Sequence, residues 1–381
     1  MGGFGGLVEL AGRRRALWPA PDAGLRRRLD DVLGMPPLGE HPTDVRRERS
    51  WTADGLAGEE LSWSVGFGPR THAWIIKPEE SAGPMPGVLA LHCHAGMKRW
   101  GKEKIADGPD EVPAEIRALR SDIYGGRAFA NDLARRGFVV LCHDALLWGA
   151  RRFPLSAMPD RVRRLSDDLR ELAERRGEPI GDERHYDMAA HHHEPVIAKY
   201  CNLLGTSILG LVAREDLIAL RLLGARPDVL PGAIGCAGLS GGGLRAGLLH
   251  ALSDDVRAAV VVAMLSSFPD MLDDHVDRHS WLSWPPGIGT VADWPDVLGL
   301  RAPSPLLAMF CAADRLFPLT GMRRADARLR ERYAAAGRPE AYTGRFHSGG
   351  HAFDRPMQDE AFTWLARTLF TPRSFGAPPS S

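Results

Sequence analysis

The chain has few cysteines for its length and no long apolar run. Its 381 residues include five cysteines, an odd number, and no two of them have C-x-x-C spacing. These counts argue against a disulfide framework, and most of the cysteines stand in or beside apolar runs, where a thiol behaves as a small buried hydrophobe. No apolar stretch approaches the ~20 residues that a helix needs to span a bilayer.

The chain also lacks a net charge. Its 48 Lys and Arg residues balance 48 Asp and Glu residues, which argues against nucleic acid or an anionic membrane as the main partner. The first 16 residues lack the apolar core of a signal peptide, and the run Arg13-Arg14-Arg15 follows the apolar residues instead of preceding them. We therefore expect a cytoplasmic protein whose partner is a small-molecule ester or acyl substrate, with a homodimer left open.

Glycine is abundant, and one glycine-rich turn carries a chemical signal. Gly238-Leu239-Ser240-Gly241-Gly242 has the form G-x-S-x-G. With 42 glycines in the chain, chance would supply this bare pattern in roughly a quarter of such chains. The context adds weight, because an apolar run (233–237) precedes the motif and a helix-like stretch (244–252) follows it. A strand, tight turn and helix would expose the Ser240 hydroxyl and set the Gly241 N–H at a helix start, where it can stabilise an oxyanion.

Further apolar runs predict a parallel sheet. Four short runs resemble 233–237 and indicate strands buried on both faces, at 87–91, 138–142, 258–265 and 305–311. Helix-like segments separate them, including 126–136, a long one at 197–223, and 321–336. This alternation is typical of βαβ units in a doubly wound α/β sheet. A hairpin (60–64 and 71–76) precedes the sheet, and a last strand ends at Phe346 before a last helix at 358–369.

Composition divides the chain into a main domain and additions. We expect an N-terminal helical extension over 1–50, with an amphipathic stretch at 25–33, and an α/β domain over 51–373. Within that domain, 153–195 predicts a cap-like insertion with a charged helix at 161–175, and 266–300 is rich in Trp and Pro. The tail 374–381 is expected to be disordered.

A serine needs a base to remove its proton, and the base needs an orienting carboxylate. In this architecture the acid and the base follow the serine, each just past the end of a strand. Asp314 follows the run 305–311 and is the favoured acid, with Asp270, one strand earlier, as the alternative. His351 is the favoured base because its glycine loop lets the ring reach across the strand ends, and His347 competes with it.

A second oxyanion donor is expected in the loop His92-Cys93-His94-Ala95-Gly96-Met97, which follows the strand 87–91. Gly96 is the first choice of donor and Ala95 the next, beside Gly241 at the serine turn.

Ser240, Asp314 and His351 in this order, with the His94-Ala95-Gly96 loop, resemble the α/β-hydrolase superfamily. More narrowly, the chain is similar to bacterial dienelactone-hydrolase-like and acetyl-xylan-esterase-like hydrolases over roughly residues 50–370. The segments that carry this likeness are 97–104, Asp144 with Gly149 and Arg151, 205–207 and 301–303. Ala95 stands where relatives often have a second Gly, and Gly241 where they have Met or Gln. The dienelactone hydrolases proper use a Cys nucleophile in place of Ser240, so lactone specificity does not carry over.

These observations predict a serine hydrolase that cleaves a carboxylic ester through an acyl-serine and needs no cofactor. The same scaffold also hosts thioesterases, lactonases, C–C hydrolases, acyl transferases and cyclases, and these stay open as alternatives. A non-catalytic binding protein would leave the ordered triad unexplained.

Four weaker signals need a structure to interpret them. Adjacent helical residues point about 100° apart, so His191-His192-His193-Glu194 predicts no metal site and instead a polar contact from the cap. The lysines of 98–104 indicate a solvated loop or recognition of a substrate carboxylate. The tryptophans of 281–294 indicate either a pocket wall or packing against the domain. Asp144 is interpreted as structural support for the active-site loops.

Overall fold

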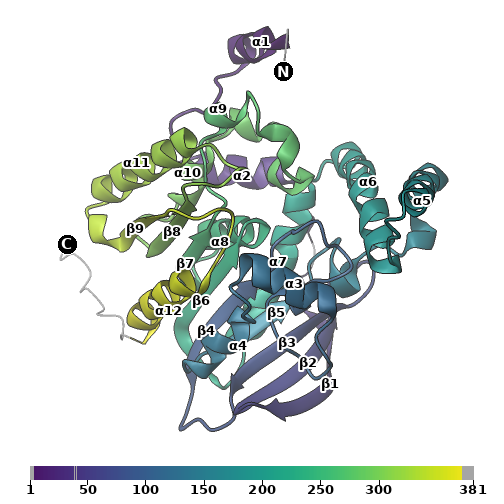
Figure 1. The fold of residues 1–381 in the computed structure, drawn as a ribbon. Helices are drawn as coiled ribbons and strands as arrows, with labels where there is room; N and C mark the ends of the chain where they lie inside the picture. The colour runs from purple at the N-terminus through teal and green to yellow at the C-terminus, as the bar shows by residue number, and fades with distance from the viewer. Residues whose placement is uncertain (1–3, 38, 40, 371–381) are drawn as a thin grey trace.

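The structure, a computed structural model, describes residues 4–37, 39 and 41–370. It is built on a nine-stranded sheet of order β1-β2-β3-β5-β4-β6-β7-β8-β9 (Figure 1). The expected tail 374–381 lies outside the described residues. The strands are β1 (Thr43–Ala53), β2 (Leu56–Ser64), β3 (Thr71–Pro78), β4 (Met85–Leu91), β5 (Val139–His143), β6 (Val229–Leu239), β7 (Val256–Val262), β8 (Leu306–Cys311) and β9 (Tyr342–His347).

The strand pairing changes from antiparallel to parallel where the N-terminal strands meet the buried apolar strands. Strands β1, β2 and β3 pair antiparallel, and β3 joins β5 antiparallel. From β5 to β9 every neighbouring pair is parallel. The predicted apolar runs coincide with these parallel strands, and β5 and β8 are buried at every position. Because parallel strands end at one edge of a sheet, the loops after β4, β6, β8 and β9 meet there.

Helices cover both faces of the sheet. One core joins α2 (Leu25–Leu33), α7 (Ile208–Gly224), α8 (Gly241–Leu252) and α11 (Leu319–Ala335), and the other joins α4 (Phe129–Arg135) and α12 (Arg355–Leu369). Strand β4 shows the division, since Leu89 belongs to the first core and Val88 to the second. The remaining helices are α1 (Gly6–Arg14), α3 (Ala114–Ile123), α5 (Asp160–Arg175), α6 (Asp182–Leu203), α9 (Phe268–Met271) and α10 (Trp294–Leu298).

The N-terminal extension is shorter than the predicted 1–50, because strand β1 already begins at Thr43. The prediction was wrong here since β1 is exposed almost throughout and carries no apolar pattern; its pairing with β2 makes it a strand. Helix α2 packs on the domain through three leucines four residues apart, all buried, at Leu25, Leu29 and Leu33. Helix α1 has no buried residue.

The predicted long helix over 197–223 is two helices, α6 and α7, at 86° to each other. Gly205 has a left-handed φ of 74°, and the Ser207 side chain caps α7 by accepting the N–H of Gly210. The predicted end of the insertion, residue 195, therefore falls inside α6. Among the described residues no single helix is long and apolar enough to cross a membrane, although α6 and α7 taken together meet those two criteria.

Helices α5 and α6 pack on each other beside the sheet (Figure 1). They share a small separate core of Met158, Val162, Tyr186, Ala189 and Ala190.

Candidate active site

Ser240 lies at the sharp turn between β6 and α8. Its φ of 57° and ψ of −122° form a strained conformation that non-glycine residues rarely adopt. The positions two residues before and two residues after Ser240 require glycine, because a Cβ on Gly242 would lie 2.1 Å from the carbonyl oxygen of Leu91 and one on Gly238 would lie 2.4 Å from Gly242. The structure thus contains the strand, turn and helix that the G-x-S-x-G pattern predicts.

Asp314 and His351 form a hydrogen-bonded pair. Asp314 follows β8 and His351 follows β9, and His351 Nδ1 lies 2.6 Å from Asp314 Oδ2. The other carboxylate oxygen, Oδ1, accepts the N–H of Leu316 at 2.8 Å. We assign the ring proton to Nδ1, which donates it in a hydrogen bond to Asp314. The other ring nitrogen, Nε2, is then free to accept a proton.

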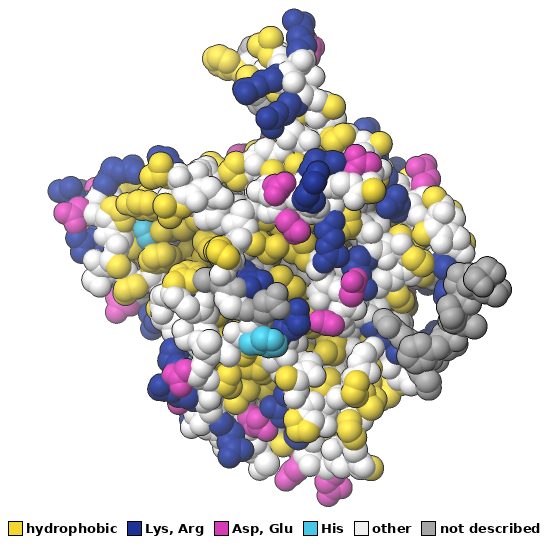
Figure 2. Space-filling view, turned by 180° about the vertical axis from the view of Figure 1, so that it is seen from behind, with side chains coloured by type: hydrophobic (Ala, Val, Ile, Leu, Met, Phe, Trp, Pro, Cys, Tyr) yellow, Lys and Arg dark blue, Asp and Glu magenta, His cyan; other side chains and the backbone are white. Residues whose placement is uncertain are grey.

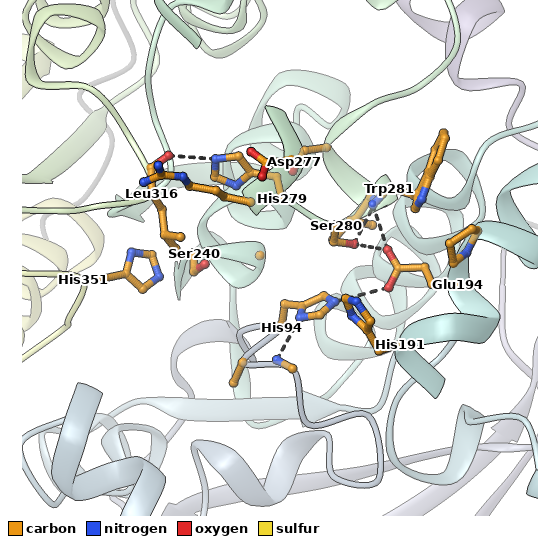
Figure 3. A pocket seen from close by; sticks show the side chains of 17 residues that line it. His94, His191, Glu194, Ser240, Asp277, His279, Ser280, Trp281, Leu316 and His351 are labelled. Carbon is orange, nitrogen blue, oxygen red and sulfur yellow. Dashed lines mark hydrogen bonds and ion pairs between the residues drawn. The ribbon is translucent and has the colours of Figure 1, made fainter. Parts of the chain in front are cut away.

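His351 and Ser240 line the same cavity, of about 420 Å³, and Figure 3 shows their side chains next to each other in it. The alternative acid and base lie elsewhere. Asp270 pairs with Arg324 at 3.1 Å, and His347 lies 3.7 Å from Glu360. The structure therefore brings together the three favoured residues and leaves both alternatives outside the cavity.

The loop after β4 approaches the serine turn closely. Ala95 and Gly96 both have a left-handed φ, of 54° and 66°. The N–H of Gly96 donates to His94 Nδ1 at 2.9 Å. A Cβ on Gly241 would lie only 3.2 Å from the backbone nitrogen of His94, so this amide lies against the turn. From the sequence, His94 was included in the expected oxyanion loop but its amide was not selected as a donor, although its place just past the end of a buried strand was a usable signal.

Glu194 of α6 joins three parts of the cavity wall. One carboxylate oxygen accepts the N–H of Trp281 at 2.8 Å and the Ser280 hydroxyl at 2.5 Å, and the other lies 3.3 Å from His94 Nε2 and contacts Lys98 Nζ (Figure 3). Burial raises the pKa of Glu194, but the hydrogen bond from His94 and the charge of Lys98 outweigh burial and hold the pKa well below its usual range.

His191 and His193, two positions apart on α6, point to different sides of the helix, while the rings of His191 and His192 contact each other at 5.4 Å between centroids. His191 lines the cavity, whereas the ring of His193 packs against Phe153 at 5.1 Å. Within 4–37, 39 and 41–370, no three His, Cys, Asp or Glu side chains are grouped so that they could hold a metal ion.

The prediction of a solvated loop for the lysines of 98–104 is wrong, and Lys98, Lys102 and Lys104 are not among the residues that line the cavity with Ser240. Lys98, Lys102 and Lys104 are only 2%, 5% and 0% exposed. Lys98 pairs with Glu194, and Lys102 pairs with the buried Asp144 at 3.0 Å. Carboxylates distant in sequence compensate the charges of Lys98 and Lys102, so composition alone could not indicate that these side chains are buried.

Asp144 fills the structural role expected of it. Its carboxylate accepts the backbone N–H of Lys102 at 3.0 Å and that of Ala150 at 2.9 Å. It thereby ties the segment after the β4 loop to the end of β5.

The tryptophans of the 281–294 segment divide between the two expected roles. Trp281 is 45% exposed and lines the cavity, whereas the buried Trp294 packs on Phe268 at 5.6 Å. Beside Ser240 and Gly241 lies a second, small cavity of about 30 Å³. Its other lining residues are mostly apolar: Leu244, Met264, Met271, His279, Ser283, Trp284, Trp294 and Phe317.

The strand order is that of the α/β-hydrolase fold, with the Ser240 turn after β6, Asp314 after β8 and the His351 loop after β9. The chain has this fold, which confirms the resemblance to the α/β-hydrolase superfamily.

Proteins named as hydrolases and esterases are similar to this chain. No family model matches the sequence. The chain is 25% identical over 345 residues to "Putative hydrolase YtaP" of Bacillus subtilis strain 168, which covers 90% of this chain and 98% of that protein. A solved "putative acetyl xylan esterase" from Bacteroides fragilis is similar at a TM-score of 0.63 and 15% identity, over 85% of this chain and 73% of that one. A glucuronoyl esterase from Solibacter usitatus gives a TM-score of 0.57 at 13% identity, over 94% and 90% of the two chains.

Proposed function

We propose that the protein is a serine hydrolase that cleaves carboxylic esters in two steps through an acyl-serine. The observation that carries this proposal is the Asp314–His351 hydrogen bond of 2.6 Å, formed by a histidine that lines one cavity with the strained Ser240. The names of the solved relatives favour an ester over other acyl compounds, since they describe an acetyl xylan esterase and a glucuronoyl esterase.

In the first step, His351 Nε2 takes the hydroxyl proton of Ser240 while Oγ attacks the ester carbonyl carbon. The tetrahedral intermediate places its negative oxygen toward the N–H of Gly241. When the intermediate collapses, the C–O bond to the alcohol breaks and His351 returns the proton to the departing alkoxide. Asp314 holds the ring in one tautomer throughout and stabilises its positive charge.

In the second step, His351 takes a proton from water, whose oxygen attacks the acyl carbon. The bond to Ser240 Oγ then breaks, the serine regains its proton and the acid is released. No cofactor enters this proposal.

The loop after β4 would supply further donors to the oxyanion. Of the two predicted from sequence, the Gly96 N–H is engaged by the His94 ring, while Ala95 lines the cavity. The amide of His94 lies nearest the serine turn. We therefore place the hole among the amides of Gly241, His94 and Ala95.

The small cavity beside Ser240 favours a short acyl group. Its volume of about 30 Å³ exceeds the roughly 10–15 Å³ that one water requires, which is room for one or two carbon atoms. The larger cavity, which is lined by polar residues and the half-exposed Trp281, would bind the alcohol portion of the ester.

The test compares the wild type with Ser240→Ala. We expect a fluorophosphonate probe to label the wild type at Ser240, and nitrophenyl acetate to be hydrolysed faster than nitrophenyl octanoate. Ser240→Ala should lose labelling and retain at most about one part in 10⁴ of kcat. A wild type that neither labels nor turns over any ester overturns the proposal. Labelling without ester turnover would point to one of the other acyl reactions of this fold.

A further inference from the structure

Lys104 is a buried ammonium group without a direct ionic partner. Its side chain is fully buried, and its Nζ donates to the carbonyl oxygens of Cys93 and His94, each at 3.0 Å. Lys98 and Lys102, in the same segment, each pair with a carboxylate, whereas no ion pair of Lys104 occurs among the described residues. Burying a charge without such a partner costs free energy, so the position of Lys104 calls for a reason.

The two carbonyls that Lys104 binds belong to the loop beside Ser240. In a trans peptide the C=O and the N–H point in opposite directions. The Cys93 carbonyl shares its peptide with the N–H of His94, and the His94 carbonyl shares its peptide with the N–H of Ala95. A cation that holds both carbonyls therefore turns both N–H groups away from itself.

The side opposite Lys104 is that of the nucleophile. The backbone nitrogen of His94 lies 3.2 Å from the position that a Cβ on Gly241 would take. His94 and Ala95 line the cavity together with Ser240. The two N–H groups that Lys104 orients thus lie where the oxyanion of the proposed reaction would form.

We propose that Lys104 is a positioning residue that orients and polarises the His94 and Ala95 amides of the oxyanion hole. The inference rests on the proposed function, since it concerns the transition state of that reaction. A hydrogen bond to each carbonyl increases the dipole of the same peptide and so strengthens its N–H as a donor. Donors that are held before the reaction need no reorganisation when the oxyanion appears.

The charge of Lys104 should then affect catalysis at alkaline pH. Burial lowers the pKa of Lys104 to about 8. The titratable and charged groups around it are His92, Cys93 and His94 on the β4 side, Glu103 beside it, Asp144 after β5, Asp187 on α6, and Arg120 on α3, whose Nε donates to the Lys104 carbonyl.

The neighbours His92, Cys93 and His94 do not change charge near pH 8. Burial lowers the pKa values of His92 and His94 and raises that of Cys93. Burial also lowers the pKa of Lys98, which pairs with Glu194, so the comparison of wild type with Lys104→Met is what assigns a fall in kcat at alkaline pH to the ammonium group of Lys104.

The test uses Lys104→Met, with Lys102→Met as the matched control in the same segment. We expect Lys104→Met to reduce kcat and the rate of fluorophosphonate labelling by about tenfold to a hundredfold. This reduction does not exceed the one expected when a whole oxyanion donor is removed. KM and the thermal unfolding temperature should stay close to the wild-type values, because the variant removes a costly buried charge. The fall in wild-type kcat near pH 8 should be absent in this variant.

Lys102→Met should show the reverse, because it leaves Asp144 buried without its cation. We expect a lower unfolding temperature, with kcat per labelled serine unchanged. A merely structural role for Lys104 would instead make both variants lose stability and keep kcat.

The outcomes separate the two proposals. A wild type that is not labelled and does not turn over esters overturns the proposed function and this inference with it. A wild type that labels, beside a Lys104→Met protein with unchanged kcat and labelling rate, overturns the inference alone. If Lys104→Met does not fold, the wild-type pH profile decides, and a kcat that stays level from pH 7 to pH 10 contradicts the inference.

Discussion

At the scale of single residues, the candidate triad depends on where each side chain finds its partner. Asp314 meets His351 through one oxygen and the Leu316 amide through the other, so its carboxylate cannot rotate away from the ring. Asp270, which also follows a strand, meets Arg324 instead. The sequence favoured Asp314 and left Asp270 as the alternative, and the contact with His351 in three dimensions supports Asp314.

Replacing Asp314 with Asn should therefore damage catalysis far more than the fold. An amide NH₂ facing Nδ1 favours the wrong histidine tautomer, and we expect kcat to fall by about 10²–10⁴. Asp270→Asn, the matched control, should retain kcat within about threefold. Steady-state kinetics and circular dichroism on both variants check this. Equal losses of activity would contradict the assignment of Asp314 as the acid.

At the scale of elements, helix α6 is fastened to the active-site loop by one buried carboxylate. Glu194 spans from α6 to His94, Lys98 and the Ser280–Trp281 turn. Residues about a hundred positions apart form this contact, so neither the histidine run nor the lysine cluster could be interpreted alone. The sequence pattern also predicted one helix where the structure has α6 and α7, because apolar residues continue across Gly205. The break depends on a local hydrogen bond, in which the Ser207 side chain accepts the N–H of Gly210.

Glu194→Gln should lower stability by about 3–5 kcal/mol at pH 7, because Lys98 would remain buried without its anion. The sign of the pH dependence follows from the lowered pKa of Glu194. The stabilisation is fully present above the pKa of an unfolded glutamate, about 4.3, and is lost as the pH falls from there toward the lower folded value. The stability gap between wild type and variant should thus shrink at pH 3.5.

Urea unfolding at pH 7 and pH 3.5 measures this gap. Glu183→Gln is the control on the same helix, since its ion pair with Arg99 is partly exposed at 3.5 Å and should contribute at most about 1 kcal/mol. A gap for Glu194→Gln that is the same size at both pH values would refute the assignment.

At the scale of the whole molecule, the N-terminal extension has two parts with different roles. Helix α2 lies in the larger core, and the Ser207 hydroxyl donates to the carbonyl of Leu33 at 2.8 Å. Helix α1 projects from the body, with hydrophobic and basic side chains exposed on it (Figure 2). Its exposed residues include Phe4 just before it, Leu7 and Leu10.

Deleting residues 1–14 should leave the stability of the domain within about 0.5 kcal/mol, because the described residues of this segment bury nothing. Leu29→Ala, in contrast, should cost about 2–5 kcal/mol through the cavity it leaves in the core. Denaturant unfolding of the two proteins distinguishes these outcomes. A large loss of stability on deletion would show that α1 packs on the domain in solution.

The sequence by itself determined the α/β sheet, the serine turn and the order of the candidate nucleophile, acid and base. These are properties of short segments and of chain order, because buried parallel strands have a distinctive apolar pattern and all their ends meet at one edge. Tertiary structure alone decided the partners of Lys98, Lys102 and Lys104, the contact between Asp314 and His351, the place of the His94 amide and the hydrogen bonds of Glu194. Each of these depends on a contact between distant residues in a site shielded from water, where the free energy of a charge depends on the groups folding brings beside it.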